Sequence, residues 1–111
     1  MKNKIKELIK NYLSTKRGVS FAEIDRMLDN YNIKHNGTKC IYFNKDSNII
    51  AWIDMSEDYM NAILELEEEK VTDMKPCEFI IYMVDGKVLN LPVVKKARNY
   101  KELHWAPCVL N

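Results

Sequence analysis

Apolar residues recur near the N-terminus with the spacing of an amphipathic helix. They fall at positions i, i+3, i+4, i+7 and i+8, which aligns them along one face of a helix. The lysines of this segment lie on the other face, and Gly18 ends it. The residues of the apolar stripe are Ile5, Leu8, Ile9, Tyr12 and Leu13.

A second helix is predicted to begin after Ser20. Ser20 and Glu23 fit a capping box, in which the serine hydroxyl accepts a hydrogen bond from the Glu23 amide and the Glu23 side chain reaches back. The helix ends before Gly37. Its apolar face consists of Phe21, Ile24, Leu28 and Tyr31.

The middle of the chain predicts a β-hairpin followed by a third helix. Two short apolar runs, residues 40–43 and 49–53, are joined by five turn-forming residues. Ser56 then caps a helix that runs to about Lys70, and the acids after it suit the positive end of the helix dipole. Its apolar side is formed by Met60, Ile63, Leu64 and Leu66.

The next segment predicts a β-ribbon. Residues 78–84 are apolar after Glu78, with almost no alternation, which is typical of a strand covered on both faces. Asp85-Gly86 is a strong hairpin signal, because a type I′ turn needs positive φ at both central residues. Residues 87–91 form the return strand, which Pro92 limits to an edge or an end.

The composition is that of one globular domain. The chain has 111 residues, 47% of them hydrophobic and 30% charged, with a net charge of +1. This balance excludes a histone-like or polybasic protein, and no apolar run approaches the ~20 residues that span a bilayer. The widely spaced cysteines indicate free thiols in a reducing compartment. We therefore expect a cytoplasmic protein that does not contact a membrane.

The predicted order is helix, helix, hairpin, helix and ribbon, which is the order of a winged helix with an added hairpin. We expect an α+β, winged-helix-like fold of three helices, an inserted β-hairpin and a C-terminal β-ribbon as the wing. Residues 1–111 would form one domain, with residues 92–111 as a C-terminal extension packed on it. By analogy with helix-turn-helix proteins, the helix over residues 56–70 takes the position that reads the DNA major groove.

Several segments also resemble known sequences. They are Gly18-Val19-Ser20-Phe21-Ala22-Glu23-Ile24, Asp85-Gly86-Lys87-Val88-Leu89-Asn90-Leu91-Pro92, Tyr100 and His104-Trp105-Ala106-Pro107. They are similar to small uncharacterised winged-helix-like proteins of phages, prophages and pathogenicity islands of low-GC Gram-positive bacteria. The resemblance covers most of the chain. It implies a mobile-element setting and carries over no catalytic residues.

The charge of the third helix argues against DNA recognition by that helix. Between Asp54 and Lys75, eight acids stand against two lysines, which leaves a charge of −6. DNA phosphates would repel such a helix, because neutralisation of phosphates supplies most non-specific affinity. Within this helix, Asn61 is the one candidate before position 70 for a side chain that reads bases. A solvated helix face is the simpler explanation of these acids.

Our first hypothesis is therefore a non-enzymatic module that acts by protein–protein contact, as a modulator of a host or phage protein. Its candidate contact residues lie on the acidic helix and the inserted hairpin. Trp52, Tyr42 and Phe43 are either interface anchors or core residues, and a small domain needs large side chains in its core. The candidate protein-binding residues are Glu57, Asp58, Asn61, Glu65, Glu68, Glu69 and Trp52.

The alternative hypothesis is a DNA-binding transcriptional regulator. Residues 1–35 carry eight basic and four acidic side chains, and residues 93–105 carry four basic side chains and one acid. Cations with interleaved aromatics can hold a phosphate backbone or a single strand. The same pattern is explained if the charged side chains only face solvent while the aromatic side chains pack on the domain. The candidate DNA-binding residues are Lys4, Lys10, Lys87, Lys95, Lys96, Arg98, Tyr100 and Lys101.

Candidate catalytic and metal-binding patterns are sparse. His104 and Cys108 have the spacing of a base and a nucleophile on a helix, but Pro107 interrupts such a helix. The cysteines and histidines lack the close pairs that are typical of structural zinc. The glycines are not clustered as a phosphate-binding loop requires. We therefore expect no enzymatic activity, no metal and no small-molecule cofactor.

Overall fold

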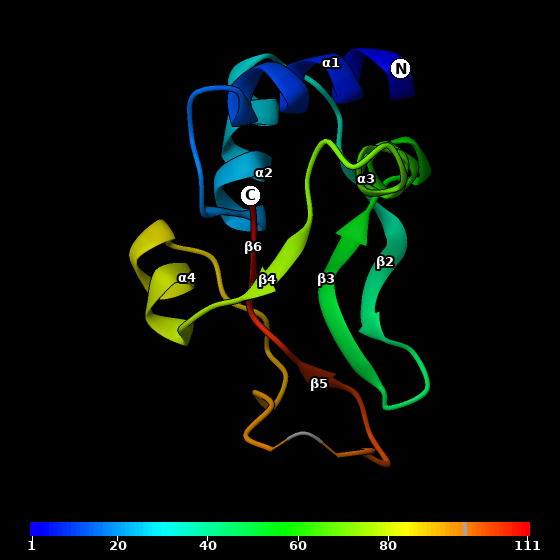
Figure 1. Ribbon diagram of the computed structural model, residues 1–111, viewed down its shortest axis with the longest axis vertical. Coiled ribbons are helices and arrows are strands. Elements are labelled where there is room, and N and C mark those ends of the chain that lie inside the picture. The colour runs from blue at the N-terminus through cyan, green and yellow to red at the C-terminus, as the bar shows by residue number, and fades with distance from the viewer. Residues whose placement is uncertain (97) are drawn as a thin grey trace.

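Four helices and two small sheets make up the part of the chain that the computed structural model describes, residues 1–96 and 98–111 (Figure 1). The helices are α1 (Lys2–Leu13), α2 (Phe21–Asn30), α3 (Glu57–Glu68) and α4 (Phe79–Asp85). The strands are β1 (Val19–Ser20), β2 (Asn36–Asn44), β3 (Ile49–Met55), β4 (Met74–Pro76), β5 (His104–Trp105) and β6 (Cys108–Leu110). None of the helices in these residues has the length and apolar character needed to cross a membrane.

The three predicted helices are confirmed, and two of them are capped as the sequence indicated. Ser20 accepts a hydrogen bond from the Glu23 amide at 3.0 Å, and Ser56 accepts one from the Tyr59 amide at 3.1 Å. Each bond satisfies a backbone N–H at the start of a helix. The Glu23 carboxylate accepts a hydrogen bond from the Tyr12 hydroxyl rather than completing the capping box, so it joins α2 to α1.

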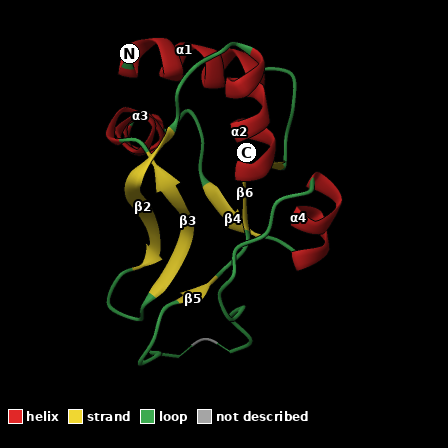
Figure 2. Ribbon diagram, turned by 180° about the vertical axis from the view of Figure 1, so that it is seen from behind, coloured by secondary structure: helices red, strands yellow, loops and turns green. Residues whose placement is uncertain are grey.

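The strands form two three-stranded sheets. β2 and β3 are the predicted hairpin, and β5 pairs in parallel with the other edge of β3. The second sheet has the order β1–β6–β4, with antiparallel neighbours. Both views place β4 between the hairpin and α4 (Figure 2). Residues 92–111, expected as an extension packed on the domain, thus supply the central strand of one sheet and an edge strand of the other.

The predicted ribbon over residues 78–91 is wrong, because most of its first half forms helix α4. A short apolar run is compatible with a strand or a helix, and the residues at its end decide between them. Gly86 adopts a left-handed conformation with a φ of 82°, and the amides of Gly86 and Lys87 bond to the Tyr82 carbonyl at 3.0 and 3.2 Å. These bonds end a helix in the manner of a Schellman motif. Residues 87–91 form no strand, so the expected wing is replaced by a helix and irregular chain.

The core is built around a cluster of buried aromatic rings. The Trp52 ring stacks on Phe21 at a centroid distance of 5.9 Å, and it lies 5.4 Å from Tyr82 and 6.1 Å from Trp105. Pairs of this kind stabilise a core by about 0.5–1.5 kcal/mol beyond the burial of their area. Trp52 is therefore a core residue and is not available as an interface anchor.

A buried carboxylate connects the helices and the hairpin around this core. Asp25 on α2 is 4% exposed. It accepts hydrogen bonds from the Tyr59 hydroxyl at 2.9 Å, the Trp52 indole N–H at 3.3 Å and the Lys87 ammonium at 2.7 Å. The His35 ring also lies nearby, with Nδ1 3.8 Å from the carboxylate. Asp25 thus holds α2, β3, α3 and the chain after α4 in one arrangement.

Candidate functional site

Helix α3 presents an outward stripe that carries acids and no cations. The side chains of this stripe recur at three- and four-residue spacing, so they share one helix face. Leu64 was expected on the apolar inner side, but it is exposed among the acids. The stripe consists of Glu57, Asp58, Asn61, Leu64 and Glu68.

The remaining acidic candidates, Glu65 of α3 and Glu69 directly after it, are paired with lysines of α1. Lys2 lies 2.5 Å from the Glu65 carboxylate, and Lys6 lies 3.0 Å from Glu65 and 2.6 Å from Glu69. The hydrogen bonds from Lys2 and Lys6 lower the pKa of Glu65. In turn, the hydrogen bonds to Glu69 and Glu65 raise the pKa of Lys6. Glu65 and Glu69 therefore join the two helices, and part of the acidic charge of α3 is neutralised within the molecule.

The basic candidates lie in two separate places. Lys4 and Lys10 are exposed on α1. The orange segment that carries Lys95 and Lys96 lies at the opposite end of the longest axis of the molecule (Figure 1), along which the Cα atoms extend over 36 Å. Lys101 is also exposed in this part of the chain. The two groups of cations do not form one continuous patch.

Two of the DNA-binding candidates make internal contacts instead. Lys87 pairs with the buried Asp25. Tyr100 is 8% exposed, and its ring stacks on His104 at 3.7 Å and lies 4.9 Å from the Arg98 guanidinium. A ring engaged in this way offers no free face for stacking on a base, which single-strand binding requires.

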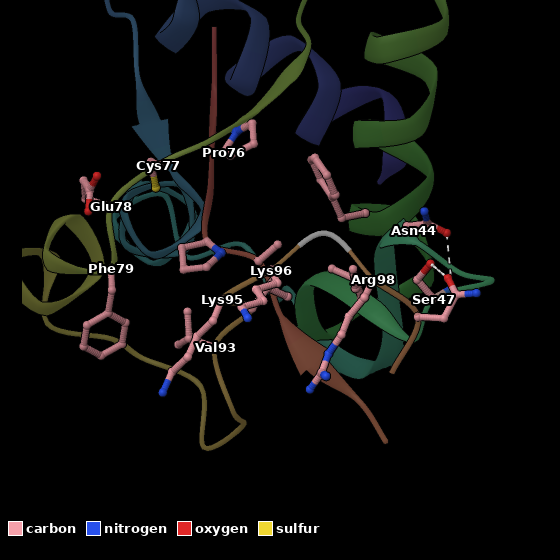
Figure 3. A pocket seen from close by; sticks show the side chains of 16 residues that line it. Asn44, Ser47, Pro76, Cys77, Glu78, Phe79, Val93, Lys95, Lys96 and Arg98 are labelled. Carbon is pink, nitrogen blue, oxygen red and sulfur yellow. Dashed lines mark hydrogen bonds between the residues drawn. The ribbon is translucent and has the colours of Figure 1, made fainter. Parts of the chain in front are cut away.

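A cleft of about 620 Å³ opens between the hairpin, the start of α4 and the chain around Val93. Figure 3 shows Phe79 on one side of this cleft and Asn44 and Ser47 on the other. The volume falls in the range of about 300–1,000 Å³ that is usual for ligand sites. Its apolar lining includes Phe43, Ile49, Phe79, Val93, Val94 and Pro107, and its charged lining is Glu78, Lys95, Lys96 and Arg98.

Helix α4 exposes most of its apolar side chains to solvent. Ile80 is 54%, Met83 55% and Val84 78% exposed, and Phe79 and Ile81 are each more than one-third exposed. The sequence pattern had indicated burial on both faces. Monomeric proteins rarely display a contiguous apolar surface of this kind unless it binds something.

The exposure of α4 does not come from loose attachment. Its Tyr82 side chain is fully buried, and the hydroxyl donates to the Cys108 carbonyl at 2.5 Å and accepts from the Phe21 amide at 3.0 Å. At the end of the helix, Ser20 donates to the Asp85 carboxylate at 2.5 Å. α4 is therefore a fixed helix that is anchored by one face.

The residues considered for catalysis make other contacts. His104 stacks on Tyr100, and the buried Cys108 thiol donates a weak hydrogen bond to the Ala106 carbonyl at 3.0 Å. Within residues 1–96 and 98–111, no three His, Cys, Asp or Glu side chains are grouped closely enough to hold a metal ion.

Cys77, which lines the cleft, is expected to react slowly with alkylating reagents at neutral pH. Burial raises its pKa to about 11, and burial raises that of Cys108 to about 12. At pH 8 only about one Cys77 thiol in a thousand is the reactive thiolate. Iodoacetamide labelling, followed by peptide mass spectrometry, should show the Cys77 rate rising about tenfold per pH unit from pH 8 to 10. A cysteine-containing model peptide is the control, and a Cys77 rate that levels off below pH 9 would contradict this expectation.

Comparisons with protein-family models, with curated proteins and with solved structures found no match for this chain. Its function is therefore inferred from its own surface. Three features stand out: the exposed apolar helix α4, the cleft with basic residues beside it, and the acidic stripe of α3.

Proposed function

We propose that this chain is a non-enzymatic binding module that acts by protein–protein contact, with α4 at the centre of the contact surface. The observation that carries the proposal is the exposure of Ile80, Met83 and Val84 on a helix that is otherwise firmly anchored. Burial of such side chains by a partner contributes on the order of 1 kcal/mol each. The resemblance to phage and prophage proteins makes a host or phage protein the expected partner.

The acidic stripe of α3 is the second region proposed to contact a protein. Glu57, Asp58 and Glu68 are exposed there without a nearby cation on the same helix. A basic surface on the partner would complement this charge and orient the complex. The same charge disfavours the alternative function, because α3 would be repelled by DNA phosphates.

The strand order β1–β6–β4 supports the finer proposal that the domain is winged-helix-like. In a winged helix, a short strand after the first helix joins the sheet formed by two strands that follow the third helix. β1 follows α1 here, and β4 and β6 follow α3. Residues 77–107 would then take the place of the wing. This relation concerns the fold alone, because one fold hosts many functions.

Photo-crosslinking from α4 tests the protein-contact proposal. A photoreactive amino acid in place of Val84 should give a discrete protein adduct in a lysate of the source cells, because this side chain is 78% exposed on the proposed surface. The double substitution Ile80→Asp/Met83→Asp should abolish the adduct. Both residues are exposed, so circular dichroism and the melting temperature should stay close to those of the unsubstituted chain.

The matched control carries the same photoreactive group in place of the exposed Lys10 of α1. The same adducts from positions 84 and 10, or none from position 84, would contradict the proposal. A gel-shift titration over a salt series tests the alternative function. Specific DNA binding that is lost on Lys95→Glu/Lys96→Glu would favour the DNA-binding regulator instead.

A further inference from the structure

We propose that the cleft beside α4 is a peptide-binding site for an acidic segment of the partner that carries one large apolar side chain. This inference rests on the proposed function and specifies the chemistry of the partner. The cleft combines an apolar wall with cations at its mouth, so its ligand must combine an apolar group with negative charge. Its volume of about 620 Å³ accommodates an aromatic side chain together with the neighbouring backbone.

The apolar wall has an aromatic side chain on each of two structural elements. Phe43 of the hairpin is 40% exposed and Phe79 of α4 is 37% exposed, so both leave apolar surface in water. Phe79 packs edge-on against the buried Trp105, with ring centroids 5.9 Å apart. The Val94 amide donates to the Trp105 carbonyl at 2.9 Å, which fixes the valine segment of the lining. An apolar anchor placed here would remove its own surface and that of the wall from water.

The charge at the mouth of the cleft is positive. Lys95, Lys96 and Arg98 are exposed there, and among the described residues of the lining Glu78 is the one acid. None of the ion pairs formed between described residues includes any of these three cations. Because opposite charges across an interface speed association and fix its register, acidic residues beside the anchor complement this mouth.

The backbone of Lys95 and Lys96 is held by hydrogen bonds to Tyr100, which itself bonds to the hairpin. The amides of Lys95 and Lys96 both donate to the Tyr100 hydroxyl at 3.3 Å, and that hydroxyl donates to the Lys96 carbonyl at 2.9 Å. The Tyr100 amide in turn donates to the Ser47 carbonyl at 3.1 Å. Backbone that is already held at Lys95 and Lys96 loses less conformational entropy when a ligand binds beside it.

A protein segment fits these features better than a nucleic acid does. Phe79 belongs both to the cleft lining and to α4, so the cleft adjoins the exposed apolar helix that a protein partner is proposed to cover. Tyr100, the aromatic residue nearest the cations in the sequence, is engaged by His104 and Arg98 and is not free to stack on bases. The cleft offers an apolar wall instead, which an aromatic or aliphatic side chain would contact.

Binding of short fluorescent peptides to the full chain, followed by fluorescence polarisation, tests this site. The probe set places one Phe, Trp or Leu between Asp and Glu residues. Matched peptides replace the apolar residue by Ser, the acids by Asn and Gln, or the acids by Lys. We expect the acidic apolar peptides to bind roughly tenfold more tightly than each matched peptide, with an affinity that falls as salt rises.

Charge reversal at the mouth provides the decisive variant. Lys95→Glu/Lys96→Glu/Arg98→Glu should weaken binding of the acidic peptide about tenfold or more and favour the lysine peptide. The matched control, Lys4→Glu/Lys10→Glu/Arg17→Glu, removes three exposed cations elsewhere and should leave binding unchanged. Equal binding of the Phe and Ser peptides would overturn the proposal, as would no binding up to about 1 mM. Tighter binding of a short single-stranded DNA than of the acidic peptide would also overturn it.

The two proposals fail in distinguishable ways. A position-84 adduct that depends on Ile80 and Met83, together with no preference among the peptides, overturns the cleft inference alone. Selective peptide binding without any position-84 adduct overturns α4 as the contact surface and retains the peptide site.

Discussion

Replacement of Asp25 by alanine is expected to lower the free energy of unfolding by about 3–5 kcal/mol, because it breaks a buried and fully engaged polar cluster. The Tyr59 hydroxyl and the Trp52 indole N–H would lose their acceptor in the core. Each buried donor left without a partner costs about 1–3 kcal/mol. Lys87 is half exposed, so its ammonium can turn to water, and it contributes less to the loss.

Chemical denaturation followed by tryptophan fluorescence measures this effect. Asp25→Asn retains one acceptor oxygen and should cost less than Asp25→Ala. Burial and the neighbouring Asp25 hold the pKa of Tyr59 well above its ordinary value, so the hydroxyl stays protonated. It therefore needs an acceptor, which asparagine still provides and alanine does not. Glu68→Ala removes an exposed acid of α3 and should change stability by less than about 0.5 kcal/mol. A similar small change for Asp25→Ala would mean that the cluster does not hold the domain together.

Truncation of Tyr82 to alanine is expected to destabilise the protein by a similar amount, about 3–5 kcal/mol, and to release α4 from the domain. The ring is fully buried against Trp52 and Trp105, with centroids 5.4 and 4.9 Å away. Its hydroxyl bridges the Phe21 amide and the Cys108 carbonyl. Tyr82→Phe keeps the ring and should cost about 1–3 kcal/mol, because those two backbone groups lose their shared partner.

Limited proteolysis and denaturation together separate the two roles of Tyr82. Tyr82→Ala should open the chain around residues 79–91 to cleavage and abolish the proposed adduct from position 84, whereas Tyr82→Phe should retain α4 on the domain. Val84→Ala is the matched control on the same helix. Val84 is exposed, so its truncation should change stability by less than about 0.5 kcal/mol. Unchanged protease sensitivity in a folded Tyr82→Ala variant would show that other contacts anchor α4.

Local patterns predicted the helices and the hairpin in the first two-thirds of the chain, but not the short strand β1. The apolar stripe of α1, the serine caps of α2 and α3, and the turn residues of the hairpin each act over a few neighbouring positions, and all of these elements are present. The charge of α3 was also evident from its sequence. Its effective charge was not, since Lys2 and Lys6 of α1 neutralise part of it through contacts across about sixty residues.

The segment over residues 78–91 shows where local patterns stop being informative. The apolar run of six residues, 79–84, can pair its backbone groups in a strand or in a helix. Asp-Gly suits both a hairpin and a helix end, because glycine permits positive φ. The choice depended on a buried anchor, Tyr82, whose partners lie 61 and 26 residues away.

The sequence by itself determined the α+β class, the positions of three helices and the hairpin, and the acidic character of α3. Tertiary structure alone decided that Trp52 belongs to the core, that Asp25 unites four segments, and that α4 faces solvent beside a cleft with basic residues at its mouth. The physical reason is the sequence separation of the residues that make each contact. Helix caps and turns are satisfied by residues a few positions apart, whereas burial and the convergence of charges depend on segments that only the folded chain brings together.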